Sequence, residues 1–561
     1  MQSYLAELYP DDVSRITTEL EKFSQTLHKV TNPFPNLSWY KFVNLYVLYP
    51  DTILSRTEKP LTALLPLLDH IKELGCTAFH ILPFFESPLI DKGFDISDYY
   101  KIRPDLGTHS DLITIKKRAD ELGLRVFIDL VFNHVSDQHQ WFKKAVQGDE
   151  KYRQYFIHCP DKPKFIRKFH KDAAVWGEYE VDGKTETINI AFPESAGEVP
   201  HWIQAEDCYW YYHTYYPQQI DVNWLNPDVF IEFAKITMYW AQFGFNFRLD
   251  AIPFVGKEAY KKVDCEHERT FAIIAALNQL ASQINPECSL IVETYESLPT
   301  VIDYFGTSNV RQAELSYNFH LCTSLWVSII KKDVNFIWEK LKYMNKIPIH
   351  AEWINFLRNH DELSLAYLPE NIKDEVSTEL LPRGASFREG YGVSGRTYSL
   401  LGKKTRRFLM AYFLLLSFPD GVAIPYGDEL GAKNIPLTKL TAAEKNDNRN
   451  INRGYLTKKH FQSATGKRLF KILSHFLKQR SKLHRYVNIE PVRLPHHDLA
   501  VFALKYEIGS SQFIVLVNLD NTLKEVALET KGFTNIAQVN RVIIKKNQVK
   551  LGAYGGVWLQ R

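Results

Sequence analysis

Eight short apolar segments run through the chain between residues 42 and 430, and helical stretches separate most of them. They read FVNLYVLYP (42–50), TAFHILPFF (77–85), RVFIDLVFNH (125–134), FNFRLDAI (245–252), LIVETY (290–295), AELSYNF (313–319), EWINFLRNHDE (352–362) and GVAIPYGDEL (421–430). Near-continuous apolar runs of this length are typical of parallel strands that are buried on both faces. Eight strand–helix units predict an α/β fold, a (β/α)8 TIM barrel.

The segments around these units predict the domain organisation. Residues 135–225 follow the third strand and residues 362–402 follow the seventh, and both are too long for ordinary barrel loops. Each insertion leaves the C-terminal end of a strand, where the active sites of barrels form. We expect a helical N-terminal extension over residues 1–38 and the barrel over residues 39–485. Alternation with period two predicts an antiparallel C-terminal β-sandwich domain over residues 486–561.

The charge balance and the apolar runs restrict the partners. A net charge of +3, from 68 basic and 65 acidic residues, offers no electrostatic reason to expect nucleic acid or an anionic membrane. The first twenty residues carry charges throughout and lack the apolar core of a signal peptide. The longest apolar run, FLMAYFLLLSF (408–418), is shorter than the roughly 20 residues of a membrane span. We therefore expect a cytoplasmic protein without a membrane segment, and its oligomeric state stays open.

The cysteines and one acidic cluster bear on metals. Six cysteines are scattered without a CxxC pair, which predicts reduced thiols. The segment DCEHE (264–268) has metal-ligating residue types, but their spacing fits no usual zinc pattern and the flanking sequence is helical. We expect no metal and no cofactor.

Polar side chains follow several of the apolar runs, at the end of each strand. The third run ends with Asp129, Asn133 and His134, the fourth with Arg248 and Asp250, the fifth with Glu293, and the seventh with His360 and Asp361. Any one pair of these charges can be a structural ion pair. Burying all of them for stability alone is unfavourable, so their convergence at the top of the barrel predicts an active site.

Three carboxylates around one pocket suit glycoside chemistry. Cleavage with retention needs a carboxylate nucleophile and a protonated carboxyl about 5–5.5 Å away. Arg248 precedes Asp250 by two residues on the same face of its strand, so we expect it to keep Asp250 ionised. Glu293 follows the apolar segment SLIV, which predicts a raised pKa for this carboxyl.

Four stretches resemble the hallmark regions of the α-amylase superfamily of retaining glycoside hydrolases and transglycosidases. They are DLVFNH (129–134), FRLDA (247–251), IVETY (291–295) and FLRNHDE (356–362), in the family's order. The resemblance spans roughly residues 40–561. It implies that Asp250 is the nucleophile, Glu293 the general acid/base, and Asp361 the carboxylate that binds sugar hydroxyls and stabilises the transition state. It also implies that the glucose pocket is lined by His134, Arg248 and His360 and supported by Asp129.

Two further segments resemble parts of the family's glucose pocket. DKGFDISDY (91–99) is similar to the segment after strand 2, which implies that Asp91 holds the terminal glucose and Phe94 stacks on its ring. A plain core aromatic is the alternative for Phe94. NDNRNINRG (446–454) is similar to the segment after strand 8 in sucrose-acting members, which implies that Arg449 pairs with Asp91 and enforces exo action. An exposed loop arginine is the alternative.

Several segments resemble different subfamilies, and two others bear on whether a metal is required. YGVSGRTYSLLG (391–402) resembles amylosucrases, FLRNHDELSL and RLDAIPF resemble trehalose synthases, and Phe94 is more typical of sucrose phosphorylases. The first βα loop lacks the DxNxDG calcium loop of oligo-1,6-glucosidases. Asn133 matches a calcium ligand of true α-amylases, but no clear partner aspartate stands out in residues 135–225, so we expect no required metal.

We therefore expect an exo-acting retaining α-glucosidase or α-transglucosylase that acts on a small α-glucoside of the sucrose, maltose or trehalose type. A glucoside phosphorylase of the sucrose phosphorylase type is the first alternative, although nothing in the sequence identifies its basic acceptor site. The second alternative is a catalytically inactive binding subunit of the same fold. It predicts lost carboxylates, whereas Asp250, Glu293 and Asp361 are all present. The donor, the acceptor and the linkage stay open.

Overall fold

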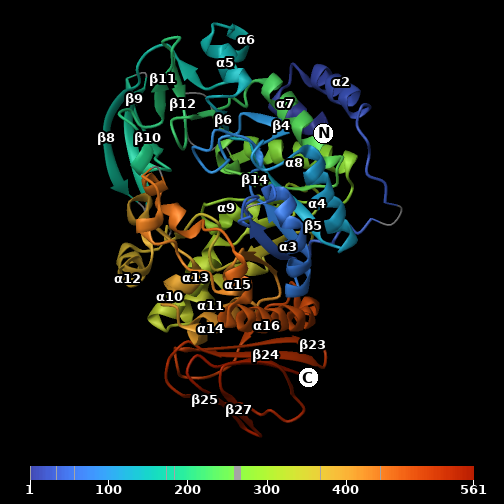
Figure 1. Cartoon of the computed structure of the whole chain (residues 1–561), viewed down its shortest axis with the longest axis vertical. Helices are drawn as coiled ribbons and strands as arrows, with labels where there is room; N and C mark the ends of the chain where they lie inside the picture. Colours follow the sequence, from blue (N-terminus) through green and yellow to red (C-terminus); the bar gives the residue numbers. More distant parts are fainter. Residues whose placement is uncertain are drawn as a thin grey trace.

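A closed barrel of eight parallel strands forms the centre of the computed structural model (Figure 1). The structure describes residues 2–32, 35–55, 57–171, 174–181, 183–257, 267–366, 368–442 and 444–561. The barrel strands, in order, are β1 (Asn44–Leu48), β2 (Ala78–Ile81), β5 (Arg125–Val131), β14 (Asn246–Asp250), β15 (Leu290–Val292), β16 (Leu315–Tyr317), β17 (Glu352–Asn355) and β21 (Gly421–Pro425). Each lies inside one of the eight apolar segments, so the predicted TIM barrel is confirmed.

Helices surround the barrel and bury the outer faces of its strands. They include α3 (Pro60–Leu74), α4 (His109–Glu121), α7 (Pro227–Ala241), α8 (His267–Ile284), α10 (Phe319–Lys331), α14 (Thr405–Leu415) and α16 (Ala464–Gln479). The start of α7 is capped by Asn226, whose side chain accepts the backbone N–H of Asp228 at 2.9 Å. The apolar run 408–418 forms most of the buried helix α14. In the part of the chain that the structure describes, no helix has the length and apolar character needed to cross a membrane.

The N-terminal extension is helical, as predicted, but it consists of two short helices. Helix α1 (Gln2–Leu8) packs against α8, and α2 (Val13–Ser24) packs against α7. Ile16 and Leu20 are the buried residues of α2, and their spacing places them on one face of the helix.

The first insertion carries small antiparallel sheets. Strands β8 (Lys164–Lys171), β9 (Ala174–Val181) and β10 (Lys184–Asn189) form one of them, at the upper left of Figure 1. Farther along, β13 (Gln219–Asp221) pairs with β6 (His134–Ser136). This pairing returns the end of the insertion to the C-terminal end of β5, beside the top of the barrel.

The second insertion meets the first over the top of the barrel. It contains α12 (Glu370–Leu380), β19 (Ala385–Phe387) and β20 (Gly392–Ser394). The Lys168 ammonium, on β8 of the first insertion, lies 2.6 Å from Oε1 of Glu389 in the second. The two insertions therefore form one continuous wall beside the strand ends.

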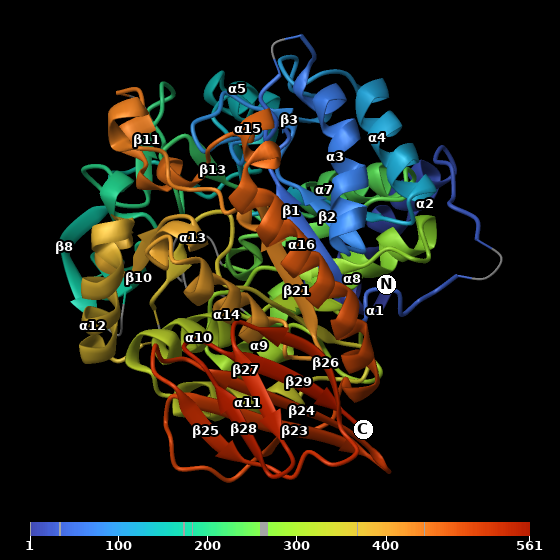
Figure 2. The ribbon, with the colours of Figure 1, turned by 60° about the horizontal axis from the view of Figure 1, so that its bottom comes forward.

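The C-terminal segment forms two antiparallel sheets below the barrel, in red in Figure 2. One sheet has the order β22-β23-β24-β29-β26 and the other β25-β28-β27. The shorter strands are β22 (Val492–Arg493), β25 (Lys524–Ala527), β26 (Thr534–Val539), β27 (Val542–Lys545), β28 (Gln548–Leu551) and β29 (Gly556–Gln560). The longest strands are β23 (Val501–Ile508) and β24 (Ser511–Asn518). Side chains from both sheets, among them Ile514 and Val549, share one apolar cluster. The predicted antiparallel β domain is confirmed, and its boundary at residue 486 stays a prediction.

Candidate active site

One pocket opens at the C-terminal ends of the barrel strands, and most of the predicted site residues meet in it. Seven of the nine line the pocket: Asp91, Phe94, His134, Asp250, Glu293, Asp361 and Arg449. The two insertions contribute further walls, with Phe192 and Tyr215 from the first and Glu362 and Arg388 from the second. Arg248 and His360 are not among the lining residues but contact them, Arg248 through Asp250 and Glu293 and His360 through Asp361, and their role at the sugar stays a prediction.

Arg248 is the centre of the acidic cluster. Its side chain is only 1% exposed, and its Nη1 atom donates to Asp129 and, at 2.7 Å, to Asp250. Its Nη2 atom donates to Glu293. The guanidinium lies 5.4 Å from the ring centroid of Phe94. Asp250 and Glu293, from neighbouring strands, are therefore held against the same guanidinium on the pocket side.

The protonation of Asp250 and Glu293 depends on burial more than on Arg248. Burial raises the pKa of Asp250 well above its ordinary value; Arg248 opposes this, and the charge of Glu293 raises the pKa further. Burial also raises the pKa of Glu293 against the effect of Arg248, as predicted. One guanidinium serves three buried carboxylates, and the prediction that Arg248 keeps Asp250 ionised stays a prediction.

Asp361 has the opposite environment. Arg453 contacts its Oδ1 atom at 2.7 Å and Arg449 contacts its Oδ2 atom at 3.2 Å. Burial raises the pKa of Asp361, but His360 and these two arginines outweigh it and hold the pKa far below its ordinary value. Burial lowers the pKa of His360 to about 3, so near neutral pH the arginines supply the positive charge. Asp361 is therefore ionised in this pocket.

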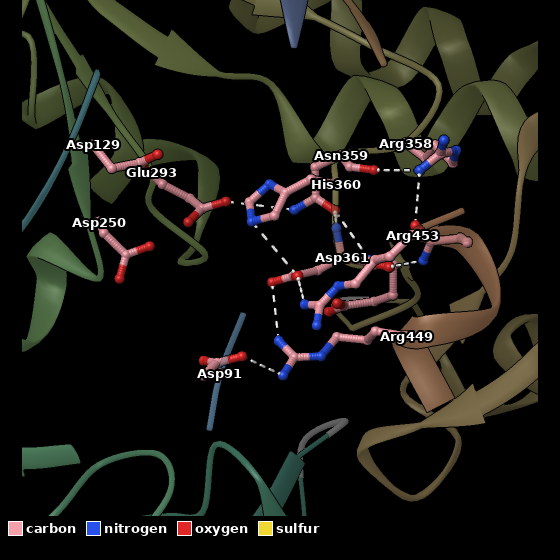
Figure 3. Close-up of polar contacts among 12 residues, drawn as sticks. Asp91, Asp129, Asp250, Glu293, Arg358, Asn359, His360, Asp361, Arg449 and Arg453 are labelled. Carbon is pink, nitrogen blue, oxygen red and sulfur yellow. Dashed lines mark hydrogen bonds and ion pairs between the residues drawn. The ribbon is translucent and has the colours of Figure 1, made fainter. Parts of the chain in front are cut away.

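Arg449 and Asp91 form the predicted ion pair, with 2.7 Å between Nη2 and Oδ1. Figure 3 shows Arg449 between Asp91 and Asp361. The Arg449 side chain is 1% exposed, and its guanidinium lies 4.8 Å from the ring centroids of both Phe192 and Phe387. The alternative of an exposed loop arginine is therefore wrong. Burial raises the pKa of Asp91, and Arg449 opposes that shift.

Phe94 and His134 form the apolar and neutral part of the pocket wall. The Phe94 ring stacks on His360 with 5.3 Å between centroids, so it belongs to the core and to the pocket at once. Burial lowers the pKa of His134 to about 4. The imidazole of His134 is therefore neutral near pH 7 and can hydrogen-bond a sugar hydroxyl without adding charge.

A lysine occupies the centre of the oxygen cluster around Asn133. The Lys257 ammonium donates to the Asn133 side-chain oxygen, lies 2.7 Å from Oδ2 of Asp221, and donates to the Phe254 carbonyl oxygen at 2.8 Å. Asn133 in turn donates to Asp221 at 3.1 Å. Asp221 is therefore the partner aspartate of Asn133. The expectation that residues 135–225 contain no clear partner aspartate is wrong. Because the ammonium already neutralises these oxygens, the set does not fit a calcium ion.

The other metal candidate, the segment DCEHE (264–268), lies partly outside the described residues, because Asp264, Cys265 and Glu266 are not among them. Within the described ranges, no group of three or more His, Cys, Asp and Glu side chains is arranged to hold a metal. The five described cysteines (76, 159, 208, 288 and 322) are unpaired.

Several pocket residues were missed at the sequence level. Asn359 accepts the backbone N–H groups of Asp361 and Glu362 at 2.9 and 3.0 Å, which fixes the turn after β17. Burial raises the pKa of Glu362 to about 7. Arg453 follows Arg449 in the segment NDNRNINRG, so the same segment could also have predicted Arg453 as a site residue. Arg388 comes from an insertion with no periodic pattern, and no signal indicated it.

Comparison with protein families adds a match to the catalytic domain of alpha-amylases over residues 61–378. The trehalose synthase of Thermus thermophilus is 31% identical over 407 residues, which cover 71% of this chain and 39% of that protein. A trehalose synthase/amylase of Mycolicibacterium smegmatis is 30% identical over 373 residues, covering 66% and 59%. Maltase A1 of Drosophila melanogaster is 26% identical over 373 residues, covering 58% and 60%. The match thus spans between about two fifths and three fifths of these relatives.

Comparison with solved structures agrees with the fold. The trehalose-6-phosphate hydrolase of Bacillus licheniformis superposes with a TM-score of 0.71 at 19% identity, covering 94% of this chain and all of that one. The trehalulose synthase of Pseudomonas mesoacidophila gives a TM-score of 0.69 at 17% identity, with coverage of 94% and 100%. At this level of identity the similarity establishes the barrel architecture alone.

Proposed function

The chain belongs to the α-amylase family, and from this premise we propose that it is an exo-acting retaining α-glucosidase or α-transglucosylase. The ion pair between Arg449 and Asp91 carries the proposal, because it bounds one side of the pocket that contains Asp250 and Glu293. A pocket bounded in this way suits a terminal glucosyl unit. The donor is a small α-glucoside, with maltose and trehalose ahead of sucrose because the relatives are called trehalose synthases and a maltase.

In the first half-reaction the Asp250 carboxylate attacks the anomeric carbon of the terminal glucosyl unit. The bond from that carbon to the leaving oxygen breaks, and Glu293 gives its proton to the oxygen. In the reactive form of this mechanism the pair carries one proton, on Glu293, and Asp250 is ionised. Asp361 stays ionised beside Arg449 and Arg453 and accepts hydrogen bonds from the sugar hydroxyls.

In the second half-reaction the Glu293 carboxylate removes a proton from water or from a sugar hydroxyl. The oxygen of that acceptor bonds to the anomeric carbon, and the bond to Asp250 breaks, so the glucosyl unit keeps its original anomeric form. Phe192, Tyr215 and Arg388 from the two insertions line the pocket, and we expect them to limit the access of water to the bound glucosyl unit. Restricted water favours transfer over hydrolysis.

The test is to incubate the purified protein separately with sucrose, maltose and trehalose, with and without phosphate, and to follow the products by proton NMR. Free α-glucose or new α-glucosides are expected, and the donor consumed fastest identifies the substrate. α-Glucose 1-phosphate that appears only with phosphate would replace the proposal with a phosphorylase. If activated glucosyl donors also failed to react, the inactive binding subunit would be the better reading.

A further inference from the structure

A second cavity adjoins the catalytic pocket. It lies between the start of helix α10 and helix α11 (Asn335–Met344), and Ala366 and Leu368 of the second insertion close it from above. Tyr295 and Phe319 line both this cavity and the catalytic pocket. These two rings are therefore the wall between the two spaces.

The ring of Tyr295 is held on three sides. Its hydroxyl donates to Oγ of Ser364. Its ring meets Phe319 edge to face, with 4.8 Å between the centroids. The Arg388 guanidinium lies 5.5 Å from the ring centroid. Because three neighbours fix the ring, it acts as a rigid wall.

The wall stands on the side of the pocket from which the leaving group departs. Tyr295 follows Glu293 by two residues, and a general acid must face the oxygen that it protonates. Arg449 and Asp91 bound the pocket through loops that follow other strands. The leaving group of a bound glucoside therefore lies next to Tyr295, and anything attached to it points toward the second cavity.

The second cavity has the chemistry of a sugar site. Phe319 and Phe336 offer aromatic surface, and sugar rings stack on such surfaces. Glu296 lines the cavity, and its buried Oε2 atom has no hydrogen-bond partner among the described residues. Glu339 and Lys340 also line it and form no ion pair with any described residue. Carboxylate and ammonium groups that line a cavity can hydrogen-bond the hydroxyls of a sugar.

We infer that Tyr295 limits the substrate to a disaccharide by separating the catalytic pocket from a cavity that can bind one more sugar residue. The inference rests on the proposed function. With the ring in place, the leaving group has room for a single sugar. Without the ring, the two spaces join, and the leaving group of a trisaccharide extends past position 295 toward Phe336.

The test compares kcat/KM for maltose and maltotriose in the wild type, Tyr295→Ala and Tyr295→Phe. Tyr295→Ala should raise the maltotriose-to-maltose ratio about tenfold or more, which is the size expected for one added sugar subsite. Tyr295→Phe keeps the ring and should keep the wild-type ratio. Adding Phe336→Ala to Tyr295→Ala should remove most of the gain, because the new subsite loses its aromatic platform.

Two results would overturn the inference. One is a wild-type enzyme that uses maltotriose as efficiently as maltose, and the other is an unchanged ratio in Tyr295→Ala. If Tyr295→Ala does not fold, Tyr295→Leu provides the same comparison with an apolar residue that lacks the ring. If the wild type turns over no α-glucoside, the proposed function has failed. The inference about Tyr295 is then tested by calorimetric measurement of maltotriose binding. Maltotriose should bind Tyr295→Ala more tightly than the wild type, and equal affinities would end the inference.

Discussion

The Nη2 atom of Arg449 lies 2.7 Å from Oδ1 of Asp91, although 358 positions separate the two residues in the chain. The contact joins the segment after β2 to the segment after β21. Phe192 and Phe387, one from each insertion, both pack against the guanidinium and against each other, with 5.3 Å between their ring centroids. A charge pair that is shielded from water in this way is stronger than an exposed one and holds its loops in a defined position.

Replacing this arginine should change the preference for substrate length. Arg449→Ala removes the partner of the buried Asp91 carboxylate and opens that side of the pocket, so the preference for short α-glucosides should weaken. We expect kcat/KM for maltose to fall about 100-fold or more, a loss of roughly 3 kcal/mol of transition-state stabilisation. Kinetics on maltose to maltotetraose measure the effect. Arg449→Lys keeps the charge and should lose less, whereas an unchanged length preference in Arg449→Ala would contradict exo closure by this pair.

The proposed roles of Asp250 and Glu293 predict different losses with different donors. Asp250→Asn should lower turnover by roughly 10⁴-fold or more with every donor, because no nucleophile remains. Glu293→Gln should fail with maltose but still react with α-glucosyl fluoride, whose leaving group needs no proton. Mass spectrometry of Glu293→Gln after fluoride treatment should find one glucosyl unit on the peptide that contains Asp250. An equal loss with both donors would remove Glu293 from the role of acid.

The proposed roles of Asp250 and Glu293 also predict the pH dependence of the rate. The reactive form has one proton on the Asp250–Glu293 pair, so kcat/KM should fall when acid adds a second proton and when base removes the first. Because burial raises the pKa of both carboxyls, both limbs should lie above the ordinary carboxyl pKa values of about 3.9 and 4.3. Rates of Glu293→Gln with α-glucosyl fluoride should lose the alkaline limb. If that limb persisted, another group would be responsible for it.

The positions of the three carboxylates could be predicted because a barrel converts sequence order into spatial order. Asp250, Glu293 and Asp361 each come at or just after the end of an apolar strand, and parallel strand ends share one face. Pairing Arg449 with Asp91 needed the resemblance to a family, since no periodicity links a loop after β2 to a loop after β21.

Other features depend on distances that the sequence does not contain. The pKa of Asp250 follows from the number of carboxylates around Arg248 and from their burial, and neither can be read from the local segment. Asp221 and Lys257 meet because β13 pairs with β6, and no turn or spacing signal indicates that antiparallel pair. Arg388 enters the pocket from an insertion of irregular structure.

The buried ammonium at Asn133 predicts stability that does not depend on a metal. Lys257→Met leaves the Asp221 carboxylate, which is fully buried, without its cation. Removing one partner of such a pair costs about 3–5 kcal/mol. Urea unfolding should show this loss, whereas Lys458→Met, at an exposed position of the chain, should change little. Treatment of the wild type with EDTA should leave the unfolding midpoint and the activity unchanged; a lowered midpoint would reveal a metal that supports this region.

The opposite end of the barrel predicts a pH-dependent stability. Glu352 begins β17, and its side chain is 1% exposed, with the nearest cation, Lys41, 3.5 Å away. Burial raises the pKa of Glu352 to about 8, and the charge of Asp420 adds to the shift while Lys41 opposes it. A carboxyl with a raised pKa in the folded state binds more protons there than in the unfolded chain, so its contribution is present below the unfolded pKa of about 4.3 and is lost as the pH rises through about 8.

The corresponding experiment is thermal unfolding at pH 6 and pH 8. The wild type should lose about 2 °C of Tm between these values through Glu352, since the folded protein must release a proton that the unfolded chain has already lost. Glu352→Gln keeps the shape and cannot ionise, so its Tm should fall much less over the same interval. Glu339→Gln, at an exposed position on α11, should behave like the wild type. An equal fall in Tm for Glu352→Gln and the wild type would show that Glu352 is not the group that titrates.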